Sequence, residues 1–142
     1  MDHTYLDTIR RYYEGCSTGD VALMKSTFTP DVTHCFTAHE PIRGADALAE
    51  FWRGFNSGDR QAVWTVDHGL ASRDEAVVEW TMITTFQDGR PRELLRGAEW
   101  VRFREGRIAE IRAYYLWTPD QRESELIGFP YAERGYPTHD AV

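Results

Sequence analysis

The sequence predicts one α+β domain in which a curved antiparallel sheet wraps around three N-terminal helices as a cone-shaped α+β barrel. Apolar residues with helical spacing mark three segments in the first part of the chain, up to residue 55. From Ala62 onward, four strand-like segments follow one another, separated by the short turns "SRDE", "QDGRP" and "EG". Helices first and hairpin-linked strands afterwards are typical of an α+β domain with an antiparallel meander.

The three helices are indicated by apolar residues at intervals of three and four. The first runs from residue 4 to about residue 16, the second is "VALMKSTF" (21–28), and the third is "ADALAEFWRGF" (45–55), with a strongly aromatic face. Between the last two, the alternating run "DVTHCF" (31–36) predicts a strand, and "HEPIRG" predicts a loop.

The sheet is predicted from period-two alternation in four later segments. They are "AVWTVDHGLA" (62–71), "EAVVEWTMITTF" (75–86), "LLRGAEWVRF" (94–103) and "RIAEIRAYYLW" (107–117). After Pro119, a short helix "DQRESEL" (120–126) and an aromatic end with little regular structure are expected.

Charge and composition narrow the range of partners. The net charge is −7, and the basic residues are scattered among acidic ones, which argues against nucleic acid and anionic membranes and favours a small molecule. No apolar run reaches membrane-spanning length, and "MDHTYLDTIRR" lacks signal-peptide features, so we expect a cytoplasmic protein. Cys16 and Cys35 have no metal-binding or redox spacing and are interpreted as structural thiols.

Two histidines are expected to point into the domain. Alternation places His34 on the face of Val32 and Phe36, and His68 on the face of Trp64 and Val66. Such a histidine can be a catalyst or a core residue bonded to backbone, and the pattern leaves both open.

Glu99 is the strongest candidate for a functional residue, because alternation puts its carboxyl group on the apolar face of Val101 and Phe103. A buried carboxylate is costly, so its pKa should rise, and it would then donate a hydrogen bond or pair with a histidine. The alternative is a salt bridge to a basic residue such as Arg112.

Three segments in this order carry a family resemblance: "RRYYEGCSTGDVALMKSTFTPDVTHCF", "PIRGADALAEFWRGF" and "EWVRFREGRIAEIRAYY". Through them the chain resembles the superfamily of ketosteroid isomerases, SnoaL-type polyketide cyclases, limonene epoxide hydrolases and nuclear transport factor 2-like proteins. The resemblance implies a homodimer with a deep pocket and neither metal nor organic cofactor. It assigns residues 1–118 to such a domain and 119–142 to an extension, interpreted as a lid, a dimer contact or a tail packed on its own domain.

The resemblance also suggests roles for two residues. In ketosteroid isomerases a helix-one tyrosine and a protonated acid on the penultimate strand form an oxyanion hole, and their positions match Tyr12 and Glu99. The first-strand aspartate of those enzymes falls at about Phe36. The two aspartates of the limonene epoxide hydrolases fall at Met82 and Ala113.

The sequence therefore predicts a cofactor-independent acid/base enzyme, a lyase, isomerase or cyclase, acting on an apolar small molecule, aromatic or polyketide-like. His34 or His68 would be the general base, and Glu99 with Tyr12 would hydrogen-bond the developing oxyanion. The substrate-binding residues would be Tyr13, Phe36, His39, Trp52, Phe55, Trp64, Trp80, Met82 and Tyr115.

Three alternatives accompany this prediction. The first is a non-catalytic small-molecule-binding or accessory protein of the same fold. The second is an interaction surface made by the outward Trp100, Tyr114 and Arg112, which would more readily pair two copies of the chain. Metal-dependent hydrolysis is less favoured, because the histidines and Glu99 have no recognised ligand spacing.

Overall fold

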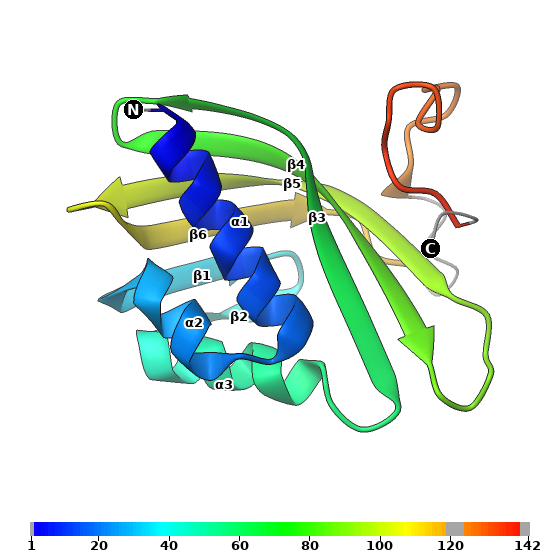
Figure 1. Cartoon of the computed structure of the whole chain (residues 1–142), viewed down its shortest axis with the longest axis horizontal. Helices are drawn as coiled ribbons and strands as arrows, with labels where there is room; N and C mark the ends of the chain where they lie inside the picture. The colour runs from blue at the N-terminus through cyan, green and yellow to red at the C-terminus, as the bar shows by residue number, and fades with distance from the viewer. Residues whose placement is uncertain (1, 119–123, 140–142) are drawn as a thin grey trace.

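The structure is a computed structural model that describes residues 2–118 and 124–139 (Figure 1). It confirms the α+β fold class. The helices are α1 (Asp2–Thr18), α2 (Val21–Thr27) and α3 (Ala45–Phe55). The strands are β1 (Phe28–Phe36), β2 (His39–Arg43), β3 (Arg60–Ser72), β4 (Glu75–Phe86), β5 (Glu93–Arg104) and β6 (Arg107–Tyr115).

All six strands form one sheet in the order β2-β1-β6-β5-β4-β3, with β2 and β3 at its edges. The segments from β3 to β6 form the predicted antiparallel meander. The sheet is mixed rather than wholly antiparallel, because β1 pairs with β6 in parallel. This pairing arises because the chain crosses through α3 from one edge of the sheet to the other, and the meander then returns to β1.

The predicted loop after β1 contains a short strand instead. Residues of β2 pair antiparallel with β1, with Thr33 opposite Arg43 and His34 opposite Ile42. The turn between them uses Ala38 at a positive φ of 58°. An edge strand tolerates the missing N–H of Pro41, which explains why a sequence that looks like a loop can pair here.

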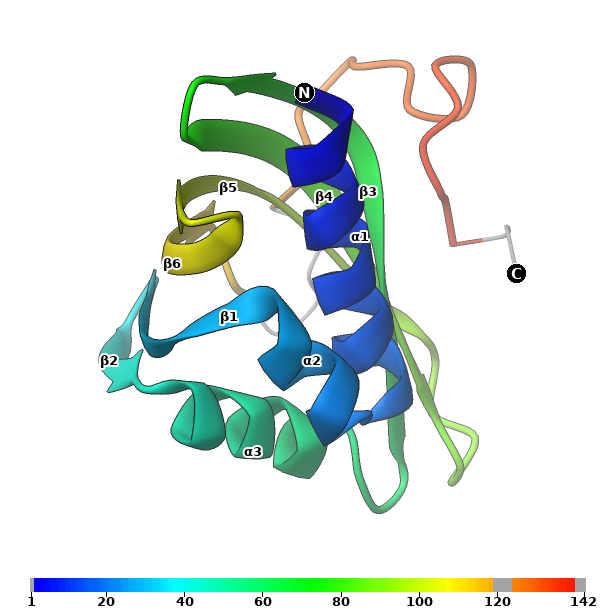
Figure 2. The ribbon, with the colours of Figure 1, turned by 60° about the vertical axis from the view of Figure 1, so that its left-hand side comes forward.

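The concave face of the sheet curls around the helices (Figure 2). The core between them contains Ile9 from α1, Met24 from α2 and Leu48 from α3, packed with Val101 and Ile111 of the sheet, all fully buried. Asp20 caps α2 by accepting a hydrogen bond from the Leu23 N–H at 3.0 Å. In the described ranges, no helix is long and apolar enough to cross a membrane.

A β-bulge in β3 reverses the inward and outward faces of this strand. Val66 pairs with Trp80, but His68 pairs with Glu79, so Asp67 is an extra residue in the ladder. Beyond the bulge, Gly69 lies under α1, where a Cβ would come within 2.9 Å of the Leu6 side chain. His68 is therefore exposed, and the prediction that it points into the domain is wrong.

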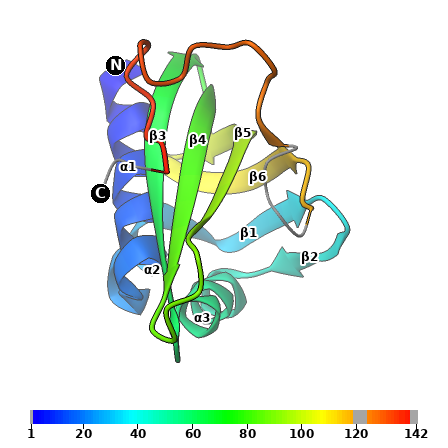
Figure 3. The same cartoon turned by 90° about the vertical axis from the view of Figure 1, so that its right-hand side faces the viewer.

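The C-terminal segment 124–139 packs against the outer face of the sheet, away from the helices (Figure 3). Its main anchor is Arg96 of β5, only 6% exposed, which donates to Glu125 at 2.9 Å and lies over the Tyr131 ring. Tyr136 donates to Glu79 at 2.5 Å. The segment contains turns, as expected, whereas most of the predicted helix 120–126 lies outside the described residues. The domain boundary at residue 118 stays a prediction.

Candidate functional site

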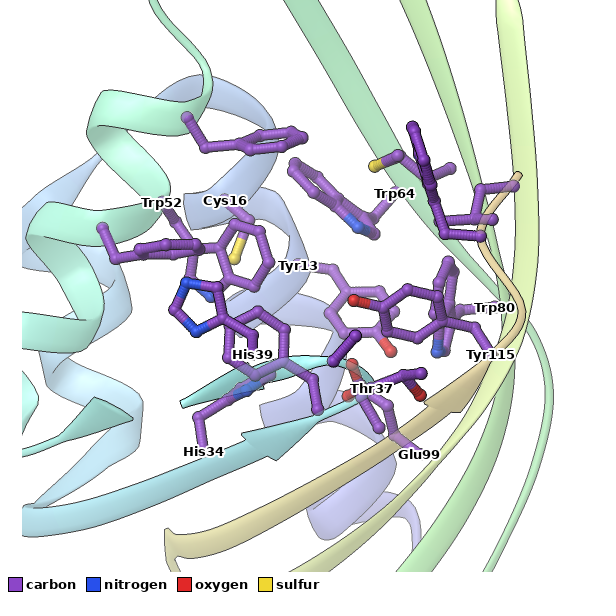
Figure 4. A pocket seen from close by; sticks show the side chains of 18 of the residues that line it. Tyr13, Cys16, His34, Thr37, His39, Trp52, Trp64, Trp80, Glu99 and Tyr115 are labelled. Atoms are coloured by element: carbon purple, nitrogen blue, oxygen red, sulfur yellow. The ribbon is translucent and has the colours of Figure 1, made fainter. Parts of the chain in front are cut away.

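A cavity of about 550 Å³ lies between the helices and the concave face of the sheet (Figure 4). Its lining is mostly aromatic. The ring centroids of Trp52 and Trp64 are 5.3 Å apart, and those of Trp80 and Tyr115 are 5.7 Å apart, both in edge-to-face arrangements. Such geometry is favoured by the quadrupoles of aromatic rings and gives the cavity a rigid apolar wall.

The structure places every predicted site residue except His68 on this cavity. They are Tyr12, Tyr13, His34, Phe36, His39, Trp52, Phe55, Trp64, Trp80, Met82, Glu99 and Tyr115. Sequence reasoning missed Cys16, Thr37, Ala38, Phe51, Leu95, Ala113, Leu116 and Trp117. The helical spacing of α3 could have indicated Phe51, which shares the aromatic face, but no pattern marks the turn residues Thr37 and Ala38.

Glu99 points into the cavity from β5, as the alternation predicts, with only 6% of its surface exposed. Its neighbours Val101 and Phe103 are also buried, while Trp100 faces outward. Arg112 forms its salt bridge with Glu110 instead, so the alternative pairing with Glu99 is absent from the described structure. Burial raises the pKa of Glu99 to about 7, and the nearby Tyr13 hydroxyl limits this rise.

Two adjacent tyrosines of α1 reach the cavity with different hydrogen bonding. The Tyr12 hydroxyl accepts a hydrogen bond from Trp52 Nε1 at 3.0 Å. By contrast, neither the Tyr13 hydroxyl nor Glu99 Oε2 has a partner of ordinary geometry among residues 2–118 and 124–139. Burial raises the pKa of both tyrosines well above the ordinary value, so both keep their protons. Tyr13 thus has both its O–H and its oxygen available to a ligand or to Glu99, whereas the Tyr12 oxygen is already bonded to Trp52.

His34 is buried against two aromatic rings. It is 1% exposed, and its ring centroid lies 4.6 Å from that of Phe36 and 5.7 Å from that of Trp52. Both of its ring nitrogens lack a hydrogen-bond partner within the described chain. Burial lowers the pKa of His34 to about 3, so the imidazole is neutral and is not poised near pH 7 as the sequence suggested.

The remaining polar groups of the lining are less distinctive. His39 is exposed, and its Nδ1 lies 2.7 Å from the Glu40 carbonyl oxygen. Cys16 is buried beside Met24, and both cysteines are free thiols. Among the described residues, no three His, Cys, Asp or Glu side chains are grouped so that they could hold a metal ion.

Residues 9–111 match the sequence model of a family described as the SnoaL-like domain. A protein of unknown function with a cystatin-like fold from Methylobium petroleophilum PM1 is 33% identical, with a TM-score of 0.71 over 97% of this chain and 93% of that one. No curated protein matches the chain.

Two more distant structures share the fold. A limonene epoxide hydrolase-like epoxide hydrolase from Mycobacterium tuberculosis is 15% identical, with a TM-score of 0.72 over 87% of this chain and 90% of that one. A protein with a ketosteroid isomerase-like fold from Catenulispora acidiphila, solved with trimethylamine, is 13% identical, with a TM-score of 0.71 over 94% and 95% of the two chains.

Proposed function

Because the chain belongs to the SnoaL-like domain family, we propose that it is a cofactor-independent acid/base enzyme that moves a proton on an apolar small molecule held in the cavity. The observation that carries this proposal is the buried Glu99 beside the unpartnered Tyr13 hydroxyl. The aromatic lining favours an aromatic or polyketide-like substrate.

In this proposal Glu99 transfers the proton. A carboxyl group with a pKa of about 7 is present in both protonation states at neutral pH, so it can accept a proton from a substrate carbon and return it to another atom of the substrate. Neutral His34, with a pKa of about 3, is a weak base and serves as a hydrogen-bond acceptor on the cavity wall. This assigns to Glu99 the base role that the sequence analysis gave to a histidine.

Tyr13 stabilises the oxyanion or enolate that forms as the proton leaves carbon. Its phenol stays protonated and makes no hydrogen bond of ordinary geometry with the described residues, so it can donate a hydrogen bond to the substrate. Tyr12 plays a supporting role: the hydrogen bond that it accepts from Trp52 fixes its oxygen, and its own O–H remains available as a second donor to the oxyanion. The reaction is an elimination, isomerisation or cyclisation.

The test follows carbon-bound hydrogen directly. A panel of apolar and aromatic ketones is incubated with the protein in deuterated water, and exchange at carbon is measured by NMR. The variant Glu99→Gln keeps the shape but cannot titrate, and exchange should fall by about a hundredfold or more. Tyr13→Phe should reduce exchange more than the matched variant Tyr12→Phe. Ligand binding that persists in Glu99→Gln, with no exchange in either protein, would favour the non-catalytic binding protein instead.

Self-association is proposed at the outer face of β5 and β6. Trp100 and Tyr114 are 40% and 60% exposed there, and large exposed aromatic residues are typical of interfaces. We propose a homodimer through this face, to be measured by light scattering over a range of concentrations with Tyr114→Lys as the disruptive variant. A cytoplasmic location stays a prediction.

A further inference from the structure

We infer that the molecule held in the cavity carries a positive charge, an amine or ammonium group, attached to its apolar body. This inference rests on the proposed function, because it takes the cavity as the substrate site. It adds the chemical class of the substrate, which the aromatic lining alone does not specify.

The charged groups of the lining point to a cation. Of the described residues that line the cavity, Glu99 is the one carboxylic acid, and none is arginine or lysine. An ionised carboxylate in such a place needs a positive partner to offset its lost hydration, and the ligand is the available source. A carboxylate or phosphate ligand would meet repulsion from Glu99 and neither arginine nor lysine in the described lining, so anionic substrates fit poorly.

The sheet register places two aromatic residues beside Glu99 on the inner face of the sheet. Trp80, Gly97 and Tyr115 lie opposite one another on β4, β5 and β6, and Glu99 pairs with Ala113 in the neighbouring row on the same face. Diagonal neighbours in a sheet are within reach of long side chains. The Trp80 indole covers Gly97, so it lies next to the carboxyl group, as do the Tyr115 ring and Val78, which pairs with Glu99 on β4.

These aromatic groups gather at the same end of the cavity as Glu99 (Figure 4). Burial raises the pKa of Tyr115, and the charge of Glu99 raises it further, which reflects how close the two side chains are. A carboxylate flanked by tryptophan and tyrosine rings is the kind of setting that binds ammonium groups, since the ring faces attract cations most strongly when water is excluded.

The other titratable groups that face Glu99 keep one charge state in the range to be tested. Tyr12, Tyr13 and Cys16 of α1 all have pKa values raised by burial and stay neutral. His34 of β1, with a pKa of about 3, is neutral above about pH 5. Inward neighbours on β4 and β5 are not titratable. His39 lies at the exposed side of the cavity, and the variant His39→Asn tests its contribution separately.

The experiment compares two ligands of the same shape by isothermal titration calorimetry. They are 4-(hydroxymethyl)-N,N,N-trimethylanilinium and 4-tert-butylbenzyl alcohol, which differ in a quaternary nitrogen against a carbon and do not titrate themselves. If only ionised Glu99 binds the cation, a pKa of about 7 predicts about 30-fold tighter binding at about pH 8.5 than at about pH 5.5. Glu99→Gln should remove this pH dependence, whereas His39→Asn should retain it.

Preferential binding of the cation at high pH, lost in Glu99→Gln, would support the inference. Equal or tighter binding of the alcohol at about pH 8.5 would overturn it while leaving the cavity as a site for neutral substrates, so the proposed function would stand. Cation binding that is independent of pH and of Glu99 would also overturn it. If neither ligand binds, the charge inference fails, and the carbon exchange assay remains the separate test of proton transfer.

Discussion

A single methyl group at Gly97 should disturb the aromatic wall of the cavity. A Cβ at this position would lie 2.5 Å and 2.8 Å from two atoms of the Trp80 indole and 2.8 Å from the Tyr114 carbonyl oxygen. The indole is 4% exposed and packs edge-on against Tyr115, and the carbonyl belongs to the sheet, so neither can move freely. The φ of Gly97 is not positive, so crowding is the cause of any strain.

We therefore expect Gly97→Ala to lower the free energy of unfolding by about 1–3 kcal/mol, the usual cost of an overpacked core. Thermal unfolding followed by circular dichroism should show a fall in Tm of roughly 3–10 °C for a chain of this size. The matched control is Gly54→Ala in α3, where a Cβ meets nothing within 4 Å and alanine should stabilise the helix by up to about 1 kcal/mol. Combining Gly97→Ala with Trp80→Phe should recover part of the loss. A Gly97→Ala protein as stable as the original would refute the proposed packing of Trp80 on β5.

Three further predictions concern pH, the bulge and the tail. Because the folded pKa of Glu99 is raised to about 7, the folded state holds its proton longer, so stability from this residue is lost as pH rises from about 4.5 to 7, by about 3 kcal/mol. His34, whose folded pKa is lowered to about 3, has the opposite effect, because its contribution to stability rises with pH between about pH 3 and 6.5. The two effects offset each other up to about pH 6.5, so urea titrations should show the free energy of unfolding falling only near pH 7. This fall should be absent from Glu99→Gln. His68→Ala should leave ligand affinity within about twofold, since the side chain is exposed beyond the bulge; a larger effect in calorimetry would contradict the register of β3. Arg96→Met removes the anchor of segment 124–139, so trypsin should cleave faster after Arg134, and an unchanged rate would show that the anchor is dispensable.

The sequence predicted the fold class and most of the cavity because periodicity reports which face of an element is buried. Glu99 was identified in this way, since one residue in a strictly alternating strand can be placed from its neighbours. The same rule failed for His68, because the extra residue Asp67 shifts the alternation and leaves no mark in composition. Alternation is a local property, so it cannot detect an insertion in the ladder.

Two other kinds of feature could not be predicted from the sequence: the pairing of distant segments and the surroundings of individual side chains. The parallel pairing of β1 with β6 joins segments about seventy residues apart, and no local pattern specifies it. Tyr12 and Tyr13 are adjacent on α1 and both buried, so the choice between them depends on where Trp52 and Glu99 lie in space. The low pKa of His34 follows from its burial, which depends on tertiary packing.

The ionisation of Glu99 is the central claim, and difference infrared spectroscopy tests it most directly. The carbonyl band of a protonated carboxyl group is followed from about pH 4 to about pH 9, and the contribution of Glu99 is assigned by subtracting the spectra of Glu99→Gln. We expect a band that is present at about pH 5.5 and disappears with an apparent pKa near 7, because burial disfavours the charged form. A carboxyl group already ionised at about pH 5.5, with a pKa near its ordinary value of 4.5, would contradict the proposed proton transfer at this site.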